Sequence, residues 1–503
     1  MAPLIALLSI LLGGESAAAS PAPNPSVAVV EVAQPAETPL AQPEVAPAKP
    51  EVERWLGKVE IPGQVIDFVV TLVETEEGLT GRLDIPVQGL EDAELQGVER
   101  DDDELRFHFE IPNQPETVWP KWVVTIDEVG ESARGVLNQS GGSFPTTMTL
   151  DATGKAEVLN RPQNPKRPFP YAEIEVTIDA GEHTLAGTLT VPSEDEFGKG
   201  PFPGAVLITG SGPQDRDETL MGHKPFLVLS DQLTRRGIAV LRYDDRGFGA
   251  STGDFARATT LDFAEDAKAC AGWIRSRPEV NHVAIIGHSE GGLIAPFVAN
   301  GNADVDCVVL LAGPGVPGRE VLIRQSRDLG KVNGVSEALL DKQEELQSEI
   351  YRLVIDDSPH EKVIPVVADL VQTQYEFIGD RLDDKLINSA AYSEYMGIVQ
   401  SRWLMQFLTL DPRPALREMT QPVLALNGSL DLQVAADQNL TEIERVFEEA
   451  GKSDQLTAIE FEGLNHLFQP ATTGGMDEYA QIETTFDEGV IERMAGWIIE
   501  NVR

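Results

Sequence analysis

The stretch Val283-Ala-Ile-Ile-Gly-His-Ser-Glu-Gly-Gly-Leu-Ile-Ala-Pro-Phe-Val-Ala-Asn300 decides the fold class of this sequence. Its first four residues are apolar, as in a buried strand, and Gly292 to Asn300 has a helical pattern. Between them, Gly287-His-Ser-Glu-Gly291 matches the G-x-S-x-G pattern, whose glycines permit a sharp turn that lifts a serine above a sheet. The helix that follows would point its positive end at that serine. The strand–turn–helix context therefore predicts a nucleophile at Ser289.

Similar short apolar runs recur on both sides of this stretch, with helical patterns between most of them. The predicted strands are Ala205–Ile208, Ala239–Arg242, Val283–Ile286, Cys307–Leu311, Val423–Leu426 and Leu456–Phe461. Continuous apolar strands joined by helical crossovers indicate an α/β fold with a parallel sheet that is covered on both faces. From about 316 to 416 the alternation stops and helical patterns such as Glu337–Leu353 and Lys362–Phe377 predominate. We expect a helical lid over the active edge of the sheet, within a catalytic domain over residues 165–503.

The residues before this domain have three different compositions. Residues 1–19 hold a short apolar run that ends in small residues, which predicts a signal peptide, although no Lys or Arg precedes the run. Residues 20–52 are rich in Pro and Ala, as in an exposed linker. Residues 53–155 contain short alternating stretches separated by turns, which predicts a small all-β domain, either a sandwich or an open barrel. We expect a secreted or periplasmic protein with no membrane insertion after signal cleavage.

The charge and the cysteines of the chain disfavour several classes of site. The 82 acidic and 39 basic residues give a formal net charge of −43, and such a surface repels the phosphates of nucleic acids. Cys270 and Cys307 fall in a predicted helix and a predicted strand, so we expect two buried free thiols. No His/Cys cluster has the spacing of a zinc site, and Arg246-Gly-Phe-Gly249 lacks the spacing of a dinucleotide site. We therefore expect no metal and no cofactor.

The chain order of serine, acid and histidine points to the partners of Ser289. Only two histidines follow Ser289, and one of them, His360, lies in the helical insertion. The other, His466, lies in a loop just after the last predicted strand, where the base must be. Asp431 follows the strand before that one, and its carboxylate would hold the His466 tautomer. Asp437 is the alternative acid, in the helical stretch that follows.

Backbone N–H groups and lid residues complete the predicted site. An oxyanion hole needs two N–H groups aimed at the developing negative oxygen, and we expect one from Glu290, the residue after the nucleophile. The other is expected from the glycine-rich loop after the first predicted strand, where Ser211 and Gly212 are both candidates. Trp403 and Phe407 lie one helical turn apart in the insertion, where they either line the acyl pocket or pack the lid onto the body.

Five motifs together resemble those of the bacterial α/β-hydrolase carboxylesterases of the EstD type. They are Gly210–Asp217, Arg242–Gly249, Gly287–Gly292, Leu430–Val434 and Leu464–Phe468. The resemblance covers about residues 167–503, and related proteins often carry a β-rich N-terminal domain as well. It implies an α/β-hydrolase fold, hydrolysis of short-chain carboxylic esters, and a triad of Ser289, Asp431 and His466.

Three other functions stay open at this point. A peptidase of the prolyl-oligopeptidase type shares the fold and the triad, but its usual propeller needs at least about four blades of four strands, too many for residues 53–155. An acyl-thioesterase is also possible. A binding protein on a hydrolase scaffold is disfavoured because nucleophile, acid and base all occur in order. The expected partner is a small-molecule ester, and the expected reaction is acyl transfer to water.

Overall fold

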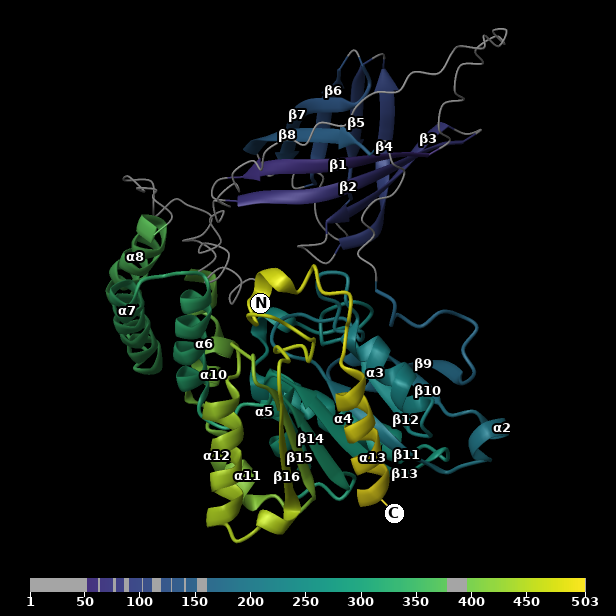
Figure 1. Ribbon diagram of the computed structural model, residues 1–503, viewed down its shortest axis with the longest axis vertical. Coiled ribbons are helices and arrows are strands. Elements are labelled where there is room, and N and C mark those ends of the chain that lie inside the picture. The colour runs from purple at the N-terminus through teal and green to yellow at the C-terminus, as the bar shows by residue number, and fades with distance from the viewer. Residues whose placement is uncertain are drawn as a thin grey trace, which may run out of the picture. The chain divides into compact units, whose positions relative to one another are not determined.

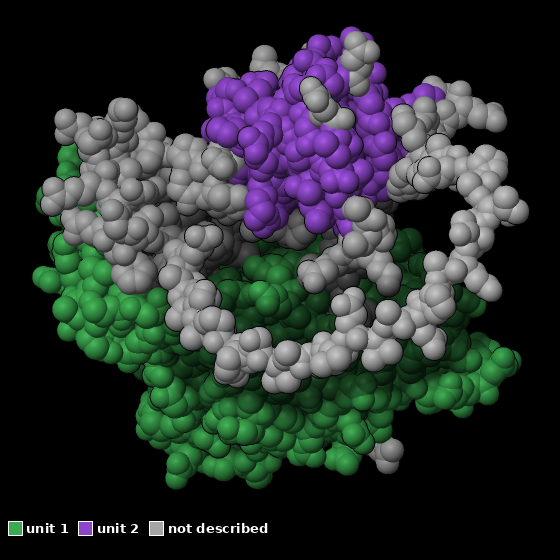
Figure 2. Space-filling view, turned by 45° about the horizontal axis from the view of Figure 1, so that its top comes forward, with its two compact units in different colours: residues 1–12, 86–89, 157–503 green, residues 13–85, 90–156 purple. Residues whose placement is uncertain are grey.

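The computed structural model divides the chain into two compact units, which Figure 2 shows in different colours. The described residues are 52–61, 64–75, 78–85, 90–101, 103–110, 119–127, 129–139, 142–151, 161–377 and 396–502. The predicted signal peptide and nearly all of the predicted linker lie outside these residues. Unit 2, which is purple in Figure 2, contains strands β1 to β8, and unit 1, which is green, contains the remaining elements that Figure 1 labels.

Unit 2 is a closed barrel of eight antiparallel strands. They are β1 (Val52–Ile61), β2 (Gln64–Thr75), β3 (Gly78–Ile85), β4 (Leu90–Asp101), β5 (Glu104–His108), β6 (Lys121–Ile126), β7 (Ser132–Gln139) and β8 (Gly142–Leu150). Each strand pairs with the next, and β1 also pairs with β8, where Trp55 lies opposite Leu150. The predicted small all-β domain is confirmed. The sandwich and the open barrel are both wrong, because the pairing of the first and last strands leaves no free edge.

The alternating residues of these strands fill the barrel with large side chains. Trp55, Phe68, Phe107 and Trp122 are almost completely buried. The Trp122 ring stacks on Phe107, with centroids 5.2 Å apart, and is tilted against Phe68 at 5.5 Å. An eight-stranded barrel is just wide enough for its interior to be filled in this way. Period-two alternation in the sequence thus produces a hydrophobic core inside the barrel.

Unit 1 is built around an eight-stranded mixed sheet in the order β16-β15-β14-β13-β11-β12-β10-β9. Its strands are β9 (Ala172–Asp179), β10 (Thr184–Val191), β11 (Phe202–Ile208), β12 (Ala239–Tyr243), β13 (Val280–His288), β14 (Cys307–Leu311), β15 (Val423–Gly428) and β16 (Leu456–Phe461). The parallel strands β11 to β16 contain all the predicted runs. Two strands lie outside the predicted runs: β10 pairs antiparallel with β12, and β9 pairs antiparallel with β10 at the edge of the sheet. Polar residues interrupt the apolar ones in both strands.

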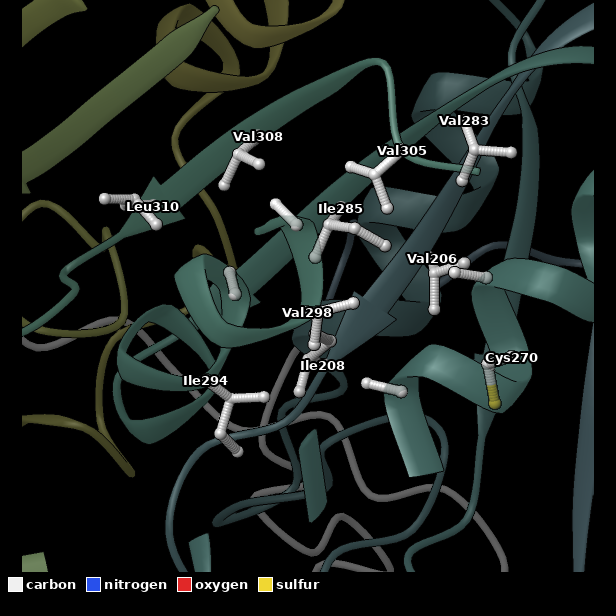
Figure 3. Close-up of a cluster of buried hydrophobic side chains, with 14 of the residues drawn as sticks. Val206, Ile208, Cys270, Val283, Ile285, Ile294, Val298, Val305, Val308 and Leu310 are labelled. Carbon is white, nitrogen blue, oxygen red and sulfur yellow. The ribbon is translucent and has the colours of Figure 1, made fainter. Parts of the chain in front are cut away.

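Helices cover both faces of this sheet. They are α3 (Pro225–Thr234), α4 (Thr260–Arg275), α5 (Glu290–Ala299), α12 (Ala436–Glu449) and α13 (Glu488–Asn501). The short helix α2 (Glu194–Phe197) has no buried residue, and 3-10 turns lie at Phe255–Arg257, Ser453–Gln455 and Met476–Glu478. Val206 and Ile208 pack with α4 and α5 on one face, as Figure 3 shows, whereas Leu207 packs with α3 and α13 on the other. Cys270 and Cys307 are buried free thiols, as predicted, and lie in the cores on opposite faces.

The described secondary structure of the insertion between β14 and β15 consists of helices joined by short loops. Its helices are α6 (Gly318–Val332), α7 (Glu337–Ile355), α8 (His360–Phe377), α10 (Arg402–Thr409) and α11 (Pro412–Glu418). Ile350, Val367 and Phe407 belong to an apolar cluster that also contains Leu293 of α5. The predicted helical insertion is therefore confirmed, and it packs on the helix that begins beside Ser289. Over the described part of the chain, no helix has the length and hydrophobicity that a bilayer crossing requires.

Candidate active site

Ser289 occupies the turn between β13 and α5 in a strained backbone conformation. Its φ of 54° and ψ of −118° lie outside the regions that most residues adopt, and such strain is concentrated at functional sites. Its N–H donates to the Leu311 carbonyl at 2.9 Å, and its own carbonyl accepts the Gly292 N–H at 2.9 Å. The helix begins at Glu290, so the Glu290 N–H belongs to the first turn, whose donors have no intrahelical acceptor. The turn thus presents a serine and a free donor side by side.

Two glycines of the motif are required by close packing around this turn. A Cβ atom on Gly287 would lie 2.0 Å from the carbonyl oxygen of Gly291. A Cβ atom on Gly291 would lie 2.2 Å from the carbonyl oxygen of Ile208, in β11. Both separations are far below van der Waals contact. The glycines therefore let β13, α5 and β11 approach closely enough to form the elbow.

His466 and Asp431 form a buried pair in the loops that follow β16 and β15. The Nδ1 atom of His466 lies 2.9 Å from Oδ2 of Asp431, and the two residues are 4% and 3% exposed. The other carboxylate oxygen accepts the N–H groups of Gln433 and Val434, each at 2.8 Å. These bonds fix the carboxylate, which favours the His466 tautomer with its proton on Nδ1. The Nε2 atom is then left as the acceptor.

His288, the residue before Ser289, joins the elbow to the His466 loop. Its Nε2 atom lies 3.0 Å from the His466 carbonyl oxygen, and the two imidazole centroids are 4.8 Å apart. The structure therefore brings Ser289 and His466 together through this neighbour. Between these described residues, no hydrogen bond joins the Ser289 hydroxyl directly to the His466 ring. Catalytic hydrogen bonds are often long without substrate and tighten when it binds.

The loop after β11 lies directly against Ser289. A Cβ atom on Gly210 would be 3.2 Å from the Ser289 Cβ. The Gly210 N–H is already used, because it donates to Oε1 of Glu218 at 2.9 Å. Ser211 lines the pocket at Ser289, whereas Gly212 lines a separate small cavity. This placement favours Ser211 over Gly212 as the second oxyanion donor.

The side chain of Glu290 is a buried carboxyl group that accepts three hydrogen bonds. Its Oε2 atom accepts the Ser211 hydroxyl at 2.7 Å, and its Oε1 atom accepts the Thr260 hydroxyl and the Trp403 indole N–H, each at 2.8 Å. Burial raises the pKa of Glu290, and the three hydrogen bonds offset only part of this effect. Because its partners lie in the loop after β11, in α4 and in α10, Glu290 joins the elbow to the helical insertion.

A pocket opens at Ser289 between the elbow and the insertion. Val321 and Leu322 of α6, together with Trp403 and Phe407 of α10, form apolar parts of its lining. The Trp403 and Phe407 rings stack with centroids 4.9 Å apart, and both side chains belong to the core of the insertion. These two residues therefore line the pocket and pack the insertion at the same time. The two alternatives that the sequence left open are not exclusive.

Sequence comparison relates this geometry to known proteins. A family model described as serine aminopeptidase, S33, matches residues 225–343, which include Ser289 but neither Asp431 nor His466. Esterase EstD of Thermotoga maritima is 26% identical over 372 residues, which are 71% of this chain and 77% of that protein. The chain is an α/β-hydrolase related to a bacterial esterase. The predicted fold and the resemblance to EstD-type esterases are thereby confirmed.

Solved structures similar to this α/β-hydrolase have low sequence identity to it. The esterase Pf2001 of Pyrococcus furiosus is 15% identical, with a TM-score of 0.41 and coverage of 67% of this chain and 92% of that one. Est1E from Butyrivibrio proteoclasticus with ferulic acid bound is 16% identical, with a TM-score of 0.37 and coverage of 65% and 99%. Proline iminopeptidase of Mycobacterium smegmatis is 14% identical, with a TM-score of 0.39 and coverage of 65% and 99%.

The alternative acid and base of the α/β-hydrolase lie away from the pocket lining. Asp437 is an exposed residue of α12 that pairs with Arg324 at 3.1 Å. His360 begins α8 and is hydrogen bonded to Gln400 at 3.0 Å near the surface. Neither lines the pocket at Ser289. Asp431 and His466 are also absent from that lining, but unlike the two alternatives they pair with each other, and the His466 carbonyl contacts the residue before Ser289.

Sequence reasoning missed three ionisable side chains next to the nucleophile of this α/β-hydrolase. Glu290 and His288 occupy the variable positions of the G-x-S-x-G pattern, and Glu218 follows the Gly210–Asp217 motif directly. Their positions beside the motifs could have drawn attention to them. Their contacts could not be read from the sequence. In the part of the chain that the structure describes, no three His, Cys, Asp or Glu side chains are arranged to hold a metal ion.

Proposed function

We propose that this α/β-hydrolase is a serine esterase that cleaves short-chain carboxylic esters through an acyl-enzyme. The observation that supports this most directly is the position of Ser289 in a strained elbow next to the loop of the buried His466–Asp431 pair. A serine hydroxyl is a poor nucleophile until a base takes its proton, and His466 Nε2 is the acceptor that Asp431 leaves free.

In the first half of the proposed reaction, Ser289 Oγ attacks the acyl carbonyl carbon while His466 takes the hydroxyl proton. Asp431 stabilises the imidazolium that forms. The negative oxygen of the tetrahedral intermediate accepts hydrogen bonds from the backbone N–H groups of Glu290 and Ser211. His466 then gives its proton to the leaving alcohol. In the second half, water attacks the acyl-enzyme with His466 as base, and the carboxylic acid and free Ser289 are released.

The pocket lining favours a small, uncharged acyl group. Val321, Leu322, Trp403 and Phe407 offer apolar surface to an acyl chain. Among the described residues that line the pocket, none is Lys, Arg or His, so an anionic substrate finds no counter-charge there. The formal net charge of −43 also repels polyanions. A neutral ester with a short apolar acyl chain fits these properties best.

Hydrolysis of aminoacyl amides is a second candidate. It is favoured by the match to the family model described as serine aminopeptidase, S33, and by the carboxyl group of Glu290 in the pocket lining. A carboxylate near the nucleophile is a natural partner for a substrate ammonium group. Both oxygens of Glu290, however, already accept hydrogen bonds from neutral donors of the protein.

A parallel panel of acyl esters, acyl-thioesters and aminoacyl amides on the purified protein tests this proposal. We expect kcat/KM to be highest for short acyl esters and to fall as the acyl chain lengthens. Ser289→Ala serves as the blank for each substrate class, because it separates enzymatic turnover from spontaneous hydrolysis. Preference for the amides by about an order of magnitude, or 1.4 kcal/mol in transition-state stabilisation, would assign the protein to the peptidases. A preference of the same size for the thioesters would assign the protein to the thioesterases.

We also propose that the protein is exported. The short apolar run and the small residues within residues 1–19 support this, and the proposal concerns residues outside those that the structure describes. Expression of the full chain followed by N-terminal sequencing of the extracytoplasmic protein tests it. Cleavage near Ala19 is expected, and an uncleaved cytoplasmic product would overturn the proposal.

A further inference from the structure

Both ring nitrogens of His288 face oxygen atoms in the interior. Nε2 lies 3.0 Å from the His466 carbonyl oxygen, and Nδ1 lies 2.9 Å from Oε1 of Glu218. His288 is 6% exposed and Glu218 is 5% exposed. A carbonyl oxygen only accepts, so Nε2 must donate a proton to it. A neutral ring would then direct the Nδ1 lone pair at the Glu218 carboxylate. Both contacts are favourable together when the ring is doubly protonated.

The Glu218 carboxylate also holds the loop after β11. The same Oε1 atom that faces His288 accepts the Gly210 N–H at 2.9 Å, so this oxygen has two donors when the ring is doubly protonated. Gly210 lies against Ser289, and its neighbour Ser211 lines the pocket. One buried pair of side chains therefore connects the nucleophile elbow, the oxyanion loop and the loop of His466.

We propose that His288 is a positioning residue that stays doubly protonated at working pH, and that its imidazolium, paired with Glu218, holds the His466 loop and the oxyanion loop against Ser289. The kinetic consequences of this role rest on the proposed ester hydrolysis, whereas the charge state of His288 does not. A charged pair suits this task because charge-assisted hydrogen bonds are about twice as strong as neutral ones and fix direction as well as distance.

The electrostatic surroundings of His288 support the charged ring. Burial by itself lowers the pKa of His288, but the charge and hydrogen bond of Glu218 and the hydrogen bond to the His466 carbonyl together raise it above its ordinary value. The Asp431 carboxylate acts in the same direction. The ionisable groups that face the ring are thus Glu218 from the loop after β11, Asp431 from the loop after β15 and His466 from the loop after β16.

Histidine NMR on the full chain tests the charge state without any turnover. With ¹⁵N-labelled histidine, we expect one imidazolium signal that persists at pH values above the ordinary histidine pKa of about 6.5. His288→Asn should remove that signal, and Glu218→Gln should return it to titration at or below about pH 6.5. A His288 ring that is neutral at pH 7 in the unmodified protein would overturn the proposal. Because this measurement needs no substrate, its outcome is independent of whether the protein hydrolyses esters.

Kinetics of Glu218→Gln test the positioning role. The substitution keeps the shape and an acceptor oxygen but removes the counter-charge, so the ring loses a proton and with it one of its two contacts. We expect kcat to fall about tenfold, as for one lost charge-assisted hydrogen bond, with KM changed less than about threefold. The loss should grow as pH rises above about 6.5, which adds a descending limb to the pH profile that the unmodified enzyme lacks.

A matched substitution separates positioning from a general loss of charge. Glu442 is a partly buried glutamate of α12 that pairs with Arg445 at 2.6 Å and Arg413 at 3.5 Å. Glu442→Gln should leave kcat and the shape of the pH profile unchanged. If Glu218→Gln shows the unmodified pH profile, or loses only thermal stability, the positioning role is refuted. If Glu218→Gln does not fold, the NMR signal of the unmodified protein still decides the charge state.

Discussion

Replacing Trp403 with leucine separates the two roles of this residue in the pocket. Trp403 is 6% exposed, stacks on Phe407 and donates its indole N–H to Glu290 at 2.8 Å. Leucine removes the ring system and the N–H donor but stays apolar. The substitution therefore shortens one wall of the pocket and leaves a buried carboxyl oxygen with a single donor, the Thr260 hydroxyl. We expect both stability and acyl-chain preference to change.

The sizes of the two effects follow from the atoms removed. Truncation of a buried aromatic residue to alanine lowers the free energy of unfolding by about 3–5 kcal/mol. Because leucine fills part of the space, we expect a loss of about 2–4 kcal/mol here. The space that is opened admits about two further acyl methylenes, each worth about 0.8 kcal/mol on burial. The ratio of kcat/KM for octanoyl over butyryl esters should therefore rise by about tenfold to twentyfold.

Initial rates on a series of p-nitrophenyl esters, from butyrate to octanoate, measure this ratio, and thermal unfolding measures stability. Trp497→Leu is the matched control. Trp497 is 5% exposed, donates its N–H to Thr457 at 3.3 Å and packs α13 on the other face of the sheet. The Trp497→Leu substitution should lower Tm and leave the ratio of kcat/KM for octanoyl over butyryl esters unchanged. Trp403→Leu could instead lower Tm and keep the octanoyl-to-butyryl ratio of kcat/KM within about twofold of that of the unmodified enzyme, which corresponds to about 0.4 kcal/mol. That result would show that Trp403 only packs the insertion.

The remaining predictions concern the proposed catalytic groups. Ser289→Ala should keep the Tm and lose about 10⁶-fold in kcat, which single-turnover assays would detect. His466→Ala should be equally inactive, whereas His360→Ala should retain activity; the opposite pattern would show that the base was assigned wrongly. Since the pKa of Glu290 is raised, its ionisation weakens the fold as pH rises above about 4.3, the ordinary glutamate value. The Tm of Glu290→Gln should therefore rise relative to that of the unmodified protein as the pH increases from about 4 to 8. A Tm difference that stays constant over this range would contradict the prediction.

The sequence predicts the central strands because they are buried on both faces. Runs such as Val283–Ile286 and Cys307–Leu311 are continuously apolar, and only a parallel sheet covered by helices buries such runs completely. The edge strand β9 is largely half-buried, and its neighbour β10 mixes threonines with apolar residues although much of it is buried, so both lack this signal. Closure of the barrel was also out of reach, because it depends on the pairing of Trp55 with Leu150, and local alternation carries no information on which distant strands meet.

The candidate site shows the same division between local and distant information. Ser289, Asp431 and His466 could be predicted as candidates because each follows a strand, in the chain order that is typical of this fold. The side chains of Glu218 and Glu290 could not be assigned a role, because each contacts residues that are distant in sequence. Glu290 meets Thr260 and Trp403, and Glu218 meets the histidine before the nucleophile. Only the folded chain brings these groups together.

The two glutamates beside the nucleophile solve different electrostatic problems. An ionised carboxylate close to the developing oxyanion would raise the barrier to reaction, because like charges repel strongly in a buried site. The charge of Glu218 is balanced by the proposed imidazolium of His288, so this carboxylate can stay ionised and hold the oxyanion loop. Within the described residues, no Lys or Arg pairs with Glu290, which instead accepts three neutral donors and has a raised pKa. Burial without a cation therefore disfavours negative charge at the residue whose backbone N–H is proposed to bind the oxyanion.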